Sequence, residues 1–235
     1  MKTETFNDLE SLCEEIKANH RMREDLLRAE MRINQQCLSI CTRLCEGSPE
    51  EGEKLFKAVK KGEEHPEKLY AMGALIDLLP HADGLAKSQK KYLKRMEKLA
   101  KQLPVWEWCE GVRGFGPLNL AKIVAEAGML HNYPGPAKLW RRMGLAVING
   151  KSQRRVTGDA ALEQGYSPHR RSLMFNVGGP LIKQGEEYRE IYLERKEVER
   201  EKLPEGSKMH IHLRAQRYME KRLLRDLWRE WKAVA

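Results

Sequence analysis

The chain has 235 residues, of which 41% are hydrophobic and 33% charged, so it can bury a core beneath a heavily charged surface. No apolar run approaches the roughly eighteen residues that a membrane span needs. The N-terminal stretch MKTETFNDLESLCEE lacks the apolar segment of a secretory signal. Five cysteines, an odd number, favour a reducing compartment over a disulfide framework. Composition therefore indicates a cytoplasmic globular protein with no membrane span.

The excess of positive charge is confined to the second part of the chain. The formal net charge is +9, but residues 1–100 carry 18 basic and 18 acidic side chains, whereas residues 101–235 carry 25 and 16. Within 113–171 the counts are 10 basic and 3 acidic. A concentrated basic segment is typical of proteins that bind a polyanion such as nucleic acid. A solvated basic surface is the alternative, and charge alone does not separate the two.

The first hundred residues predict long helices. Apolar residues recur in steps of three and four from Asn7 to Cys45, the pattern of a coiled coil or a long helical hairpin. Further helices are expected, with Pro80 separating the last two: a short one within 46–68, then 67–79 and 82–103. We expect residues 1–103 to form a helical region that dimerises.

Three cysteines share one face of the first predicted helix. Cys37, Cys41 and Cys45 are four residues apart, and they lack the paired CxxC arrangement of a zinc site. Small apolar filler on a buried stripe is the preferred interpretation.

After Pro104 the sequence changes character. Glycines and prolines cluster between short apolar stretches as far as Pro136, which predicts a compact module of short helices and tight turns. A basic, loop-rich stretch is expected from Val147 to Gly165, followed by three helices: 168–175, 181–202 and 208–232. The predicted fold is all-α. A long helical hairpin or coiled coil over 1–103 precedes a domain over 104–235 that contains a helix-hairpin-helix module and ends in a long helix.

The segment EGVRGFGPLNLAKIVAEAG has the features of a helical hairpin that binds anions through its backbone. The glycines of Gly114-Phe115-Gly116 allow a sharp turn and leave room for a phosphate. Pro117 suits the first position of the next helix, whose free N–H groups and positive dipole end attract anions. Arg113 and Lys122 add positive charge on either side of the turn. A plain turn between two core helices is the alternative.

Paired arginines supply the other candidate contacts. Arginine forks match phosphates and, in a groove, guanine edges. Three such doublets lie in the least acidic part of the chain: Arg141-Arg142, Arg154-Arg155 and Arg170-Arg171. The two histidines His210 and His212 do not predict a metal site, because no cysteine or carboxylate at ligand spacing completes it.

The order of these features carries a family resemblance. Val112 to Gly128 form one block, Tyr133 to Leu145 a second, and Gly165 with Arg170-Arg171 a third, ahead of a long basic C-terminal helix. This order resembles the C-terminal transposase domain of the DEDD-type insertion-sequence transposases related to the Piv DNA invertases. The resemblance covers about Pro104 to Phe175. The neutral helices before it are similar to the coiled-coil linker of the same family.

The resemblance implies DNA binding and a nucleophilic serine in the loop after the second block. Ser152, in NGKSQRR, is the nearest candidate, although the Ser-Gly pair typical of the family is absent. Its neighbours Lys151, Arg154 and Arg155 can hold a phosphate but do not deprotonate a hydroxyl. Family members also carry an N-terminal RuvC-like domain whose four acidic residues bind divalent metal. Because the chain begins at the helical linker, we expect no catalysis by this chain alone and no cofactor.

Three functions are consistent with these features. The first is a DNA-binding protein of the transposase or recombinase class that grips the phosphate backbone of duplex or branched DNA through the hairpin. It would be a homodimer joined by its N-terminal helices. The second is a recombinase subunit in which Ser152 attacks a phosphodiester and a partner chain supplies the metal domain. The third is a structural protein-interaction module. Structured RNA is the alternative nucleic-acid partner, and no membrane partner is expected.

Overall fold

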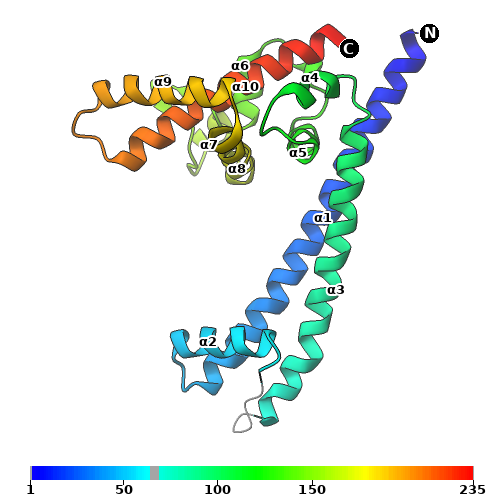
Figure 1. Ribbon diagram of the computed structural model, residues 1–235, viewed down its shortest axis with the longest axis vertical. Helices are drawn as coiled ribbons and strands as arrows, with labels where there is room; N and C mark the ends of the chain where they lie inside the picture. The colour runs from blue at the N-terminus through cyan, green and yellow to red at the C-terminus, as the bar shows by residue number, and fades with distance from the viewer. Residues whose placement is uncertain (1, 64–68, 235) are drawn as a thin grey trace. The chain divides into compact units, whose positions relative to one another are not determined.

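The computed structural model describes residues 2–63 and 69–234, with the side chains of 8–63 and 73–234. Helices dominate this part of the chain, and its only strands form one two-stranded antiparallel sheet, so the predicted all-α class is confirmed (Figure 1). A long helix, α1 (Lys2–Leu44), comes first and another, α10 (Lys208–Val234), comes last, as predicted. None of the described helices combines the length and apolar character that crossing a membrane requires.

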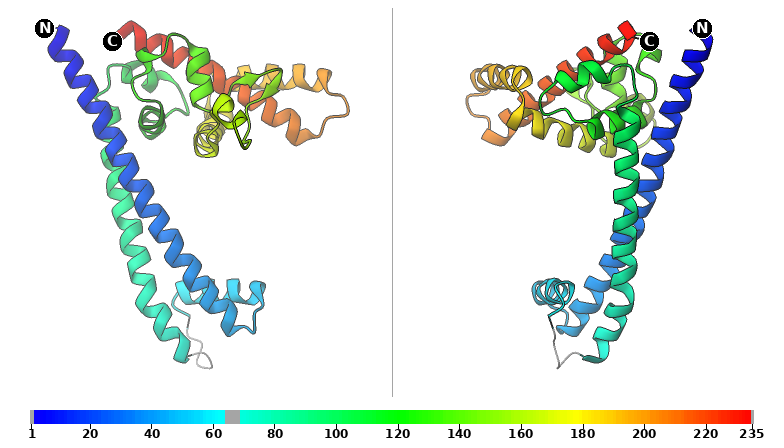
Figure 2. Two further views of the ribbon diagram at one scale, coloured as in Figure 1. Left: turned by 180° about the vertical axis from the view of Figure 1, so that it is seen from behind. Right: turned by 45° about the vertical axis from the view of Figure 1, so that its right-hand side comes forward.

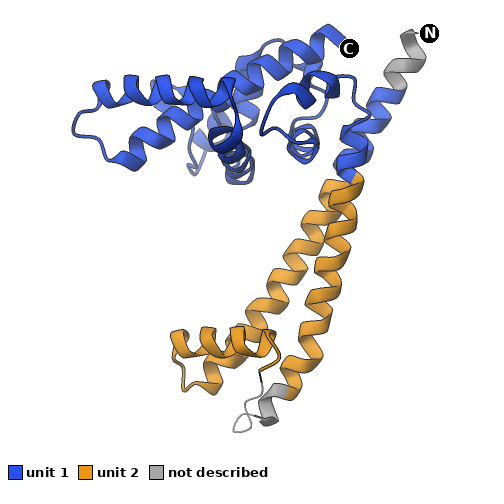
Figure 3. Cartoon of the chain, viewed as in Figure 1, with its two compact units in different colours: residues 1–18, 96–235 blue, residues 19–95 orange. Residues whose placement is uncertain are grey.

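The chain folds as two compact units (Figure 3). The smaller unit comprises residues 19–95, and the larger unit comprises residues 1–18 and 96–235. The sequence predicted a single division after Leu103. The units divide elsewhere because Ile16 of α1 and Met96 of α3 (Leu69–Ala100) are buried in the same apolar cluster as the residues of the larger unit.

The smaller unit is built on two long helices. In it, α1 and α3 run side by side in opposite directions, as all views show (Figure 2). The short helix α2 (Pro49–Lys60) begins after Ser48, whose hydroxyl accepts a hydrogen bond from the backbone N–H of Glu51.

The core of the smaller unit contains the cysteine stripe. Cys37, Cys41 and Cys45 are buried, form no disulfide and pack with Leu55 and Leu75. Their predicted role as apolar filler is therefore confirmed.

The predicted break at Pro80 is wrong, because α3 continues through this proline. Proline removes one helical hydrogen bond and usually kinks or ends a helix. Here Leu75 and Ala82 are buried on either side of it, and their burial favours a continuous helix over a break. The predicted start of the preceding helix at Glu67 lies outside the described residues.

The larger unit packs short helices around α10. The elements that precede it are α4 (Trp106–Gly111), α5 (Pro117–Ala127), η2 (Leu130–Asn132), α6 (Pro136–Arg142), β1 (Val147–Ile148), β2 (Lys151–Ser152), α7 (Ala160–Gln164), α8 (Pro168–Gln184) and α9 (Glu187–Lys202). The buried face of α10 includes Leu223, Leu224 and Leu227, and this helix contacts α6, α8, α9 and η2. It is therefore the central helix of the larger unit.

One helix of the larger unit is longer than predicted. The expected helix over 168–175 extends to Gln184 through Pro180, and Ser167 caps its start by accepting a hydrogen bond from the backbone N–H of Arg170. The chain breaks instead at Gly185, where a Cβ atom would lie 2.4 Å from the carbonyl oxygen of Leu181. Only glycine fits such a close approach of the backbone, so it sets the end of α8.

Candidate nucleic-acid interface

The predicted helical hairpin is present as α4, a tight turn and α5. Phe115 is 2% exposed and anchors the turn in the core of the larger unit. Gly114 has a φ of +87°, and a Cβ atom there would lie 2.9 Å from the carbonyl oxygen of Pro180 in α8. Gly114 is therefore required for both the turn and its packing, whatever the turn binds.

Gly116 has a different environment from Gly114. Its φ is −80°, which any residue adopts, and no atom lies within 4 Å of the position of a Cβ. It precedes Pro117, the first residue of α5, and its carbonyl oxygen accepts from the N–H groups of Asn119 and Leu120. The open space at Gly116 and the start of α5 is compatible with the close approach of a phosphate.

Acidic side chains balance the charge around the hairpin. Arg113 forms an ion pair with Glu186 at 2.6 Å, and Glu110 lines the same surface depression as Arg113. Lys122, on the far side of the turn, is half-buried and engaged with a neighbour. The hairpin therefore offers backbone groups to an anion, but little uncompensated positive charge.

Two of the predicted arginine doublets hold the fold together. Arg142 donates to the carbonyl oxygen of Glu126 at 2.9 Å, and Arg170 donates to the carboxylate of the same residue, also at 2.9 Å. Arg141 donates to the carbonyl oxygen of Glu163. These contacts join α5, α6, α7 and α8. The side chains of Arg141 and Arg142 remain exposed, so they could also reach a ligand.

Arg171 lies in a buried ion pair. It donates to Glu220 at 2.7 Å, and the side chains are 13% and 0% exposed. Gln216 donates to the same carboxylate at 3.0 Å. Burial raises the pKa of Glu220 to about 7, although the charges of Arg171 and Arg217 oppose the rise. The position of Arg171 therefore indicates a structural role beneath the surface of the larger unit.

A buried glutamine orders the loop that carries Ser152. Gln153 is 2% exposed, and its side chain accepts from the N–H of Ala146 at 3.2 Å. Its amide nitrogen donates to the carbonyl oxygens of Arg141 at 3.1 Å and Gln164 at 2.6 Å. These bonds connect the two ends of the basic loop and fix the adjacent β1–β2 hairpin. Sequence inspection missed Gln153, because its role depends on partners about ten residues away on both sides.

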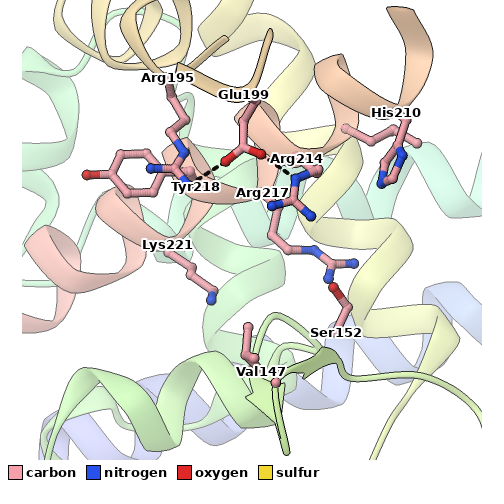
Figure 4. Close-up of a pocket in the computed structure, with 11 residues that line it drawn as sticks. Val147, Ser152, Arg195, Glu199, His210, Arg214, Arg217, Tyr218 and Lys221 are labelled. Atoms are coloured by element: carbon pink, nitrogen blue, oxygen red, sulfur yellow. Dashed lines mark hydrogen bonds and ion pairs between the residues drawn. The ribbon is translucent and has the colours of Figure 1, made fainter. Parts of the chain in front are cut away.

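An open groove of about 470 Å³ lies beside Ser152 (Figure 4). Three elements form its walls. The β1–β2 hairpin contributes Val147, Gly150 and Ser152, and α9 contributes Arg195 and Glu199. The remaining wall is one face of α10, which contributes His210, Leu213, Arg214, Arg217, Tyr218 and Lys221.

The groove carries more positive than negative charge. Glu199, 1% exposed, pairs with both Arg195 and Arg214. Burial would raise its pKa, but these two arginines hold it below its ordinary value. No carboxylate lining the groove pairs with Arg217 or Lys221. The groove therefore has a surplus of cations.

Arg217 and Lys221 both lie close to other positive charges. Burial, and then the charge of Arg171, lowers the pKa of Arg217, while the carboxylate of Glu220 opposes the change. Burial, and then the charge of Arg217, lowers the pKa of Lys221. Like charges held together in this way gain from the arrival of an anion, because it relieves both repulsion and the cost of burial.

Ser152 faces this cationic wall. It is exposed, and its hydroxyl points toward the guanidinium of Arg217 (Figure 4). Its neighbours Lys151, Arg154 and Arg155 are also exposed, and their side chains make no ion pair within the described part of the chain. Arginines donate hydrogen bonds but do not take a proton from a serine, so these surroundings suit a phosphate contact better than nucleophile activation.

The predicted contacts do not come together in one site. The hairpin gathers Arg113 and Gly116, whereas the groove gathers Ser152 with residues of α9 and α10 that the sequence analysis did not select. The signal for the α10 residues was available, because His210, Arg214, Arg217 and Lys221 are spaced by four, three and four residues. This spacing places them on one helical face.

Comparisons of the chain with protein-family models, with curated proteins and with solved structures found no match. Functional assignment therefore depends on the residues and geometry described above.

Proposed function

We propose that the larger unit binds DNA through its phosphate backbone and that the protein works with a transposase or recombinase. The observation that carries the proposal is the surplus of cations at the Ser152 loop and groove. Five basic side chains there form no ion pair among the described residues: Lys151, Arg154, Arg155, Arg217 and Lys221. Concentrated, unpaired Lys and Arg side chains favour a polyanion, and backbone contacts of this kind do not depend on base sequence.

The hairpin is the second contact in this proposal. Its backbone at Gly116 is open, and the N-terminal end of α5 carries the positive end of the helix dipole. Because acidic residues balance Arg113, we assign the hairpin a positioning contact and the groove the larger electrostatic share of the affinity.

Fluorescence anisotropy tests the proposal with a labelled DNA duplex at two salt concentrations. Affinity should fall steeply with salt, with a logarithmic slope of about −0.9 per phosphate contact. Replacing Lys151, Arg154 and Arg155 together by glutamine should weaken binding and make this slope shallower. The matched control replaces three exposed basic residues outside the groove, Arg189, Lys202 and Lys208, by glutamine. Equal losses in the two triple variants would reject a site at the groove, and no binding by the wild type would reject the proposal.

The hairpin contact is tested separately with Gly116→Leu. The open space at this position accepts a side chain without disturbing the fold, while the side chain would block a phosphate. Weaker DNA binding with an unchanged melting temperature supports the contact. Unchanged binding would show that the hairpin does not contact DNA and is only a turn between core helices.

A catalytic role for Ser152 is the second candidate function. The observation that favours it is the exposed hydroxyl in a cationic groove, where a phosphate could be held beside it. In this candidate a partner chain supplies the metal-binding domain. Strand cleavage by the mixed proteins should vanish in Ser152→Ala while DNA binding changes little. Cleavage that persists in Ser152→Ala would reject the candidate.

The proposal also covers the cellular compartment and the oligomeric state of the protein. Five buried cysteines that form no disulfide support a reducing compartment and hence the cytoplasm, where the DNA would be reached. We propose a homodimer through the long helices of the smaller unit, with structured RNA as the competing ligand to include in the titration. Light scattering should then give twice the 27.3 kDa mass of one chain, and a single-chain mass would overturn the dimer.

A further inference from the structure

The cationic wall of the groove has the dimensions of a short stretch of nucleic-acid backbone. His210, Arg214, Arg217 and Lys221 follow one face of α10, and the distance along the helix from the first to the last is about 16 Å. The pair of arginines around Glu199 contributes one net positive charge, and Arg217 and Lys221 contribute one each. This balance suits a ligand that carries more than one negative charge.

The groove also has an apolar part, which a phosphate alone would not use. Val147 is 56% exposed, and Leu213 and Tyr218 are each 37% exposed, although all three are large apolar or aromatic side chains. Exposed apolar groups gathered in a cleft indicate a ligand with an apolar surface of its own. Tyr218 already has one cation near its ring, the guanidinium of Arg195 at 4.7 Å from the centroid.

A nucleotide combines these two requirements, since its phosphate is anionic and its base is flat and largely apolar on both faces. In an intact duplex the bases are stacked and paired, so they could not reach the apolar side chains. The groove volume of about 470 Å³ falls within the range of small-ligand pockets and below what a length of duplex would occupy.

We propose that this groove receives an unpaired nucleotide of a DNA strand, with its phosphate between Ser152 and Arg217 and its base against Leu213 and Tyr218. The inference rests on the proposed function and sharpens it. DNA with an unpaired end, flap or branch point is the preferred substrate, and fully paired duplex is held only by the backbone contacts.

Anisotropy with two matched substrates tests the inference. One is a blunt DNA hairpin, and the other is the same hairpin with three unpaired nucleotides at its end. The wild-type protein should bind the second about tenfold more tightly, as expected when one base gains a stacking contact. Leu213→Ser and Tyr218→Ala should each weaken binding of the hairpin with unpaired nucleotides more than binding of the blunt hairpin, and so reduce this preference. The matched control is Val198→Ser, since Val198 is also 37% exposed but lies outside the groove.

A fluorescent base gives a readout that a purely structural role of these residues would not change. With 2-aminopurine as one of the unpaired bases, wild type and Val198→Ser should alter its emission on binding, and Leu213→Ser should not. Equal affinity of the wild type for both substrates would overturn the inference while the proposed function stands. A preference that persists in both Leu213→Ser and Tyr218→Ala would also overturn it. If the protein bound neither the blunt hairpin nor the hairpin with unpaired nucleotides, both proposals would be rejected together.

Discussion

The turn at Gly114-Phe115-Gly116 and the groove beside Ser152 are both candidate anion sites, but they are assembled in different ways. The turn is local in sequence, its backbone is open at Gly116, and its one exposed arginine is paired with Glu186. The groove brings together three elements, and Arg217 and Lys221 in it have no acidic partner among the lining residues. A recognisable backbone motif and an electrostatic site therefore need not coincide. The balance of charges in the folded chain distinguishes the two kinds of site better than the presence of a recognisable motif does.

The largest expected effect concerns Arg171, which the sequence placed among the nucleic-acid contacts. Replacing it by methionine removes the partner of a fully buried carboxylate, so the free energy of unfolding should fall by about 3–5 kcal/mol. Urea denaturation at pH 8 measures the loss. Arg170→Met is the matched control from the same doublet, because its partner Glu126 is 17% exposed and the loss should be smaller. Equal, small losses in both variants would show that the Arg171–Glu220 pair is not structural.

The second effect is a pH dependence that arises from the same pair. Burial raises the pKa of Glu220 to about 7. The folded state therefore holds this proton more tightly than the unfolded state does. The stabilisation from Glu220 is complete below its ordinary pKa of about 4.5 and is lost as the pH rises through about 7, with a limiting slope of about 1.4 kcal/mol per pH unit.

Glu220→Gln isolates this contribution, because the amide cannot titrate. The stability of the wild type relative to Glu220→Gln should fall between pH 5 and pH 8 in urea denaturation. A constant difference across this range would show that Glu220 keeps the same protonation state in the folded and unfolded chains.

Single helices could be predicted from the sequence, but their continuity could not. Steps of three and four located α1, and the expected helices over 168–175 and 208–232 gave the correct starts of α8 and α10. Pro80 was taken as a helix breaker, and the helix from Pro168 was expected to end at Phe175. Pro80 and Pro180 both lie inside helices, because buried neighbours on either side outweigh the lost hydrogen bond. The helix propensity of the local sequence does not include this contribution from tertiary packing.

The candidate site was predictable only where its residues are neighbours in the chain. The hairpin turn was found because its glycines, Phe115 and Pro117 are contiguous. The groove was not found, because Ser152 and Arg217 are 65 residues apart and no local pattern joins them. The spacing of the basic residues on α10 could be read from the sequence. The β1–β2 hairpin and α9, which form the other walls of the groove, could not be assigned to the same site from the sequence.

The third effect compares the two glycines of the turn. Gly114→Ala should lower the free energy of unfolding by about 1–3 kcal/mol, because alanine is strained at a φ of +87° and its Cβ would contact the carbonyl of Pro180 at 2.9 Å. Gly116→Ala should change it by less than about 0.5 kcal/mol. Thermal denaturation measures both. Equal destabilisation would remove the distinction between a packing glycine and an open one, and Gly116 would no longer serve as a clean probe of phosphate binding.

A substitution at Gln153 should have a small effect on global stability and a large local effect. Gln153→Ala leaves the carbonyl oxygens of Arg141 and Gln164 without their side-chain donor, and the loop around Ser152 loses the hydrogen bonds that connect its two ends. Because loop carbonyls can recover water as they open, we expect a loss of about 1 kcal/mol in unfolding free energy. Amide exchange should accelerate across 146–156 but not in α10. DNA affinity should fall as it does when Lys151, Arg154 and Arg155 are neutralised, although Gln153→Ala removes no charge. A variant with faster exchange in the loop but unchanged DNA affinity would show that the groove binds without a fixed Ser152 wall. In that case the cations of α10 would bind DNA without the Ser152 loop. The groove would then differ from the hairpin only in its unbalanced positive charge.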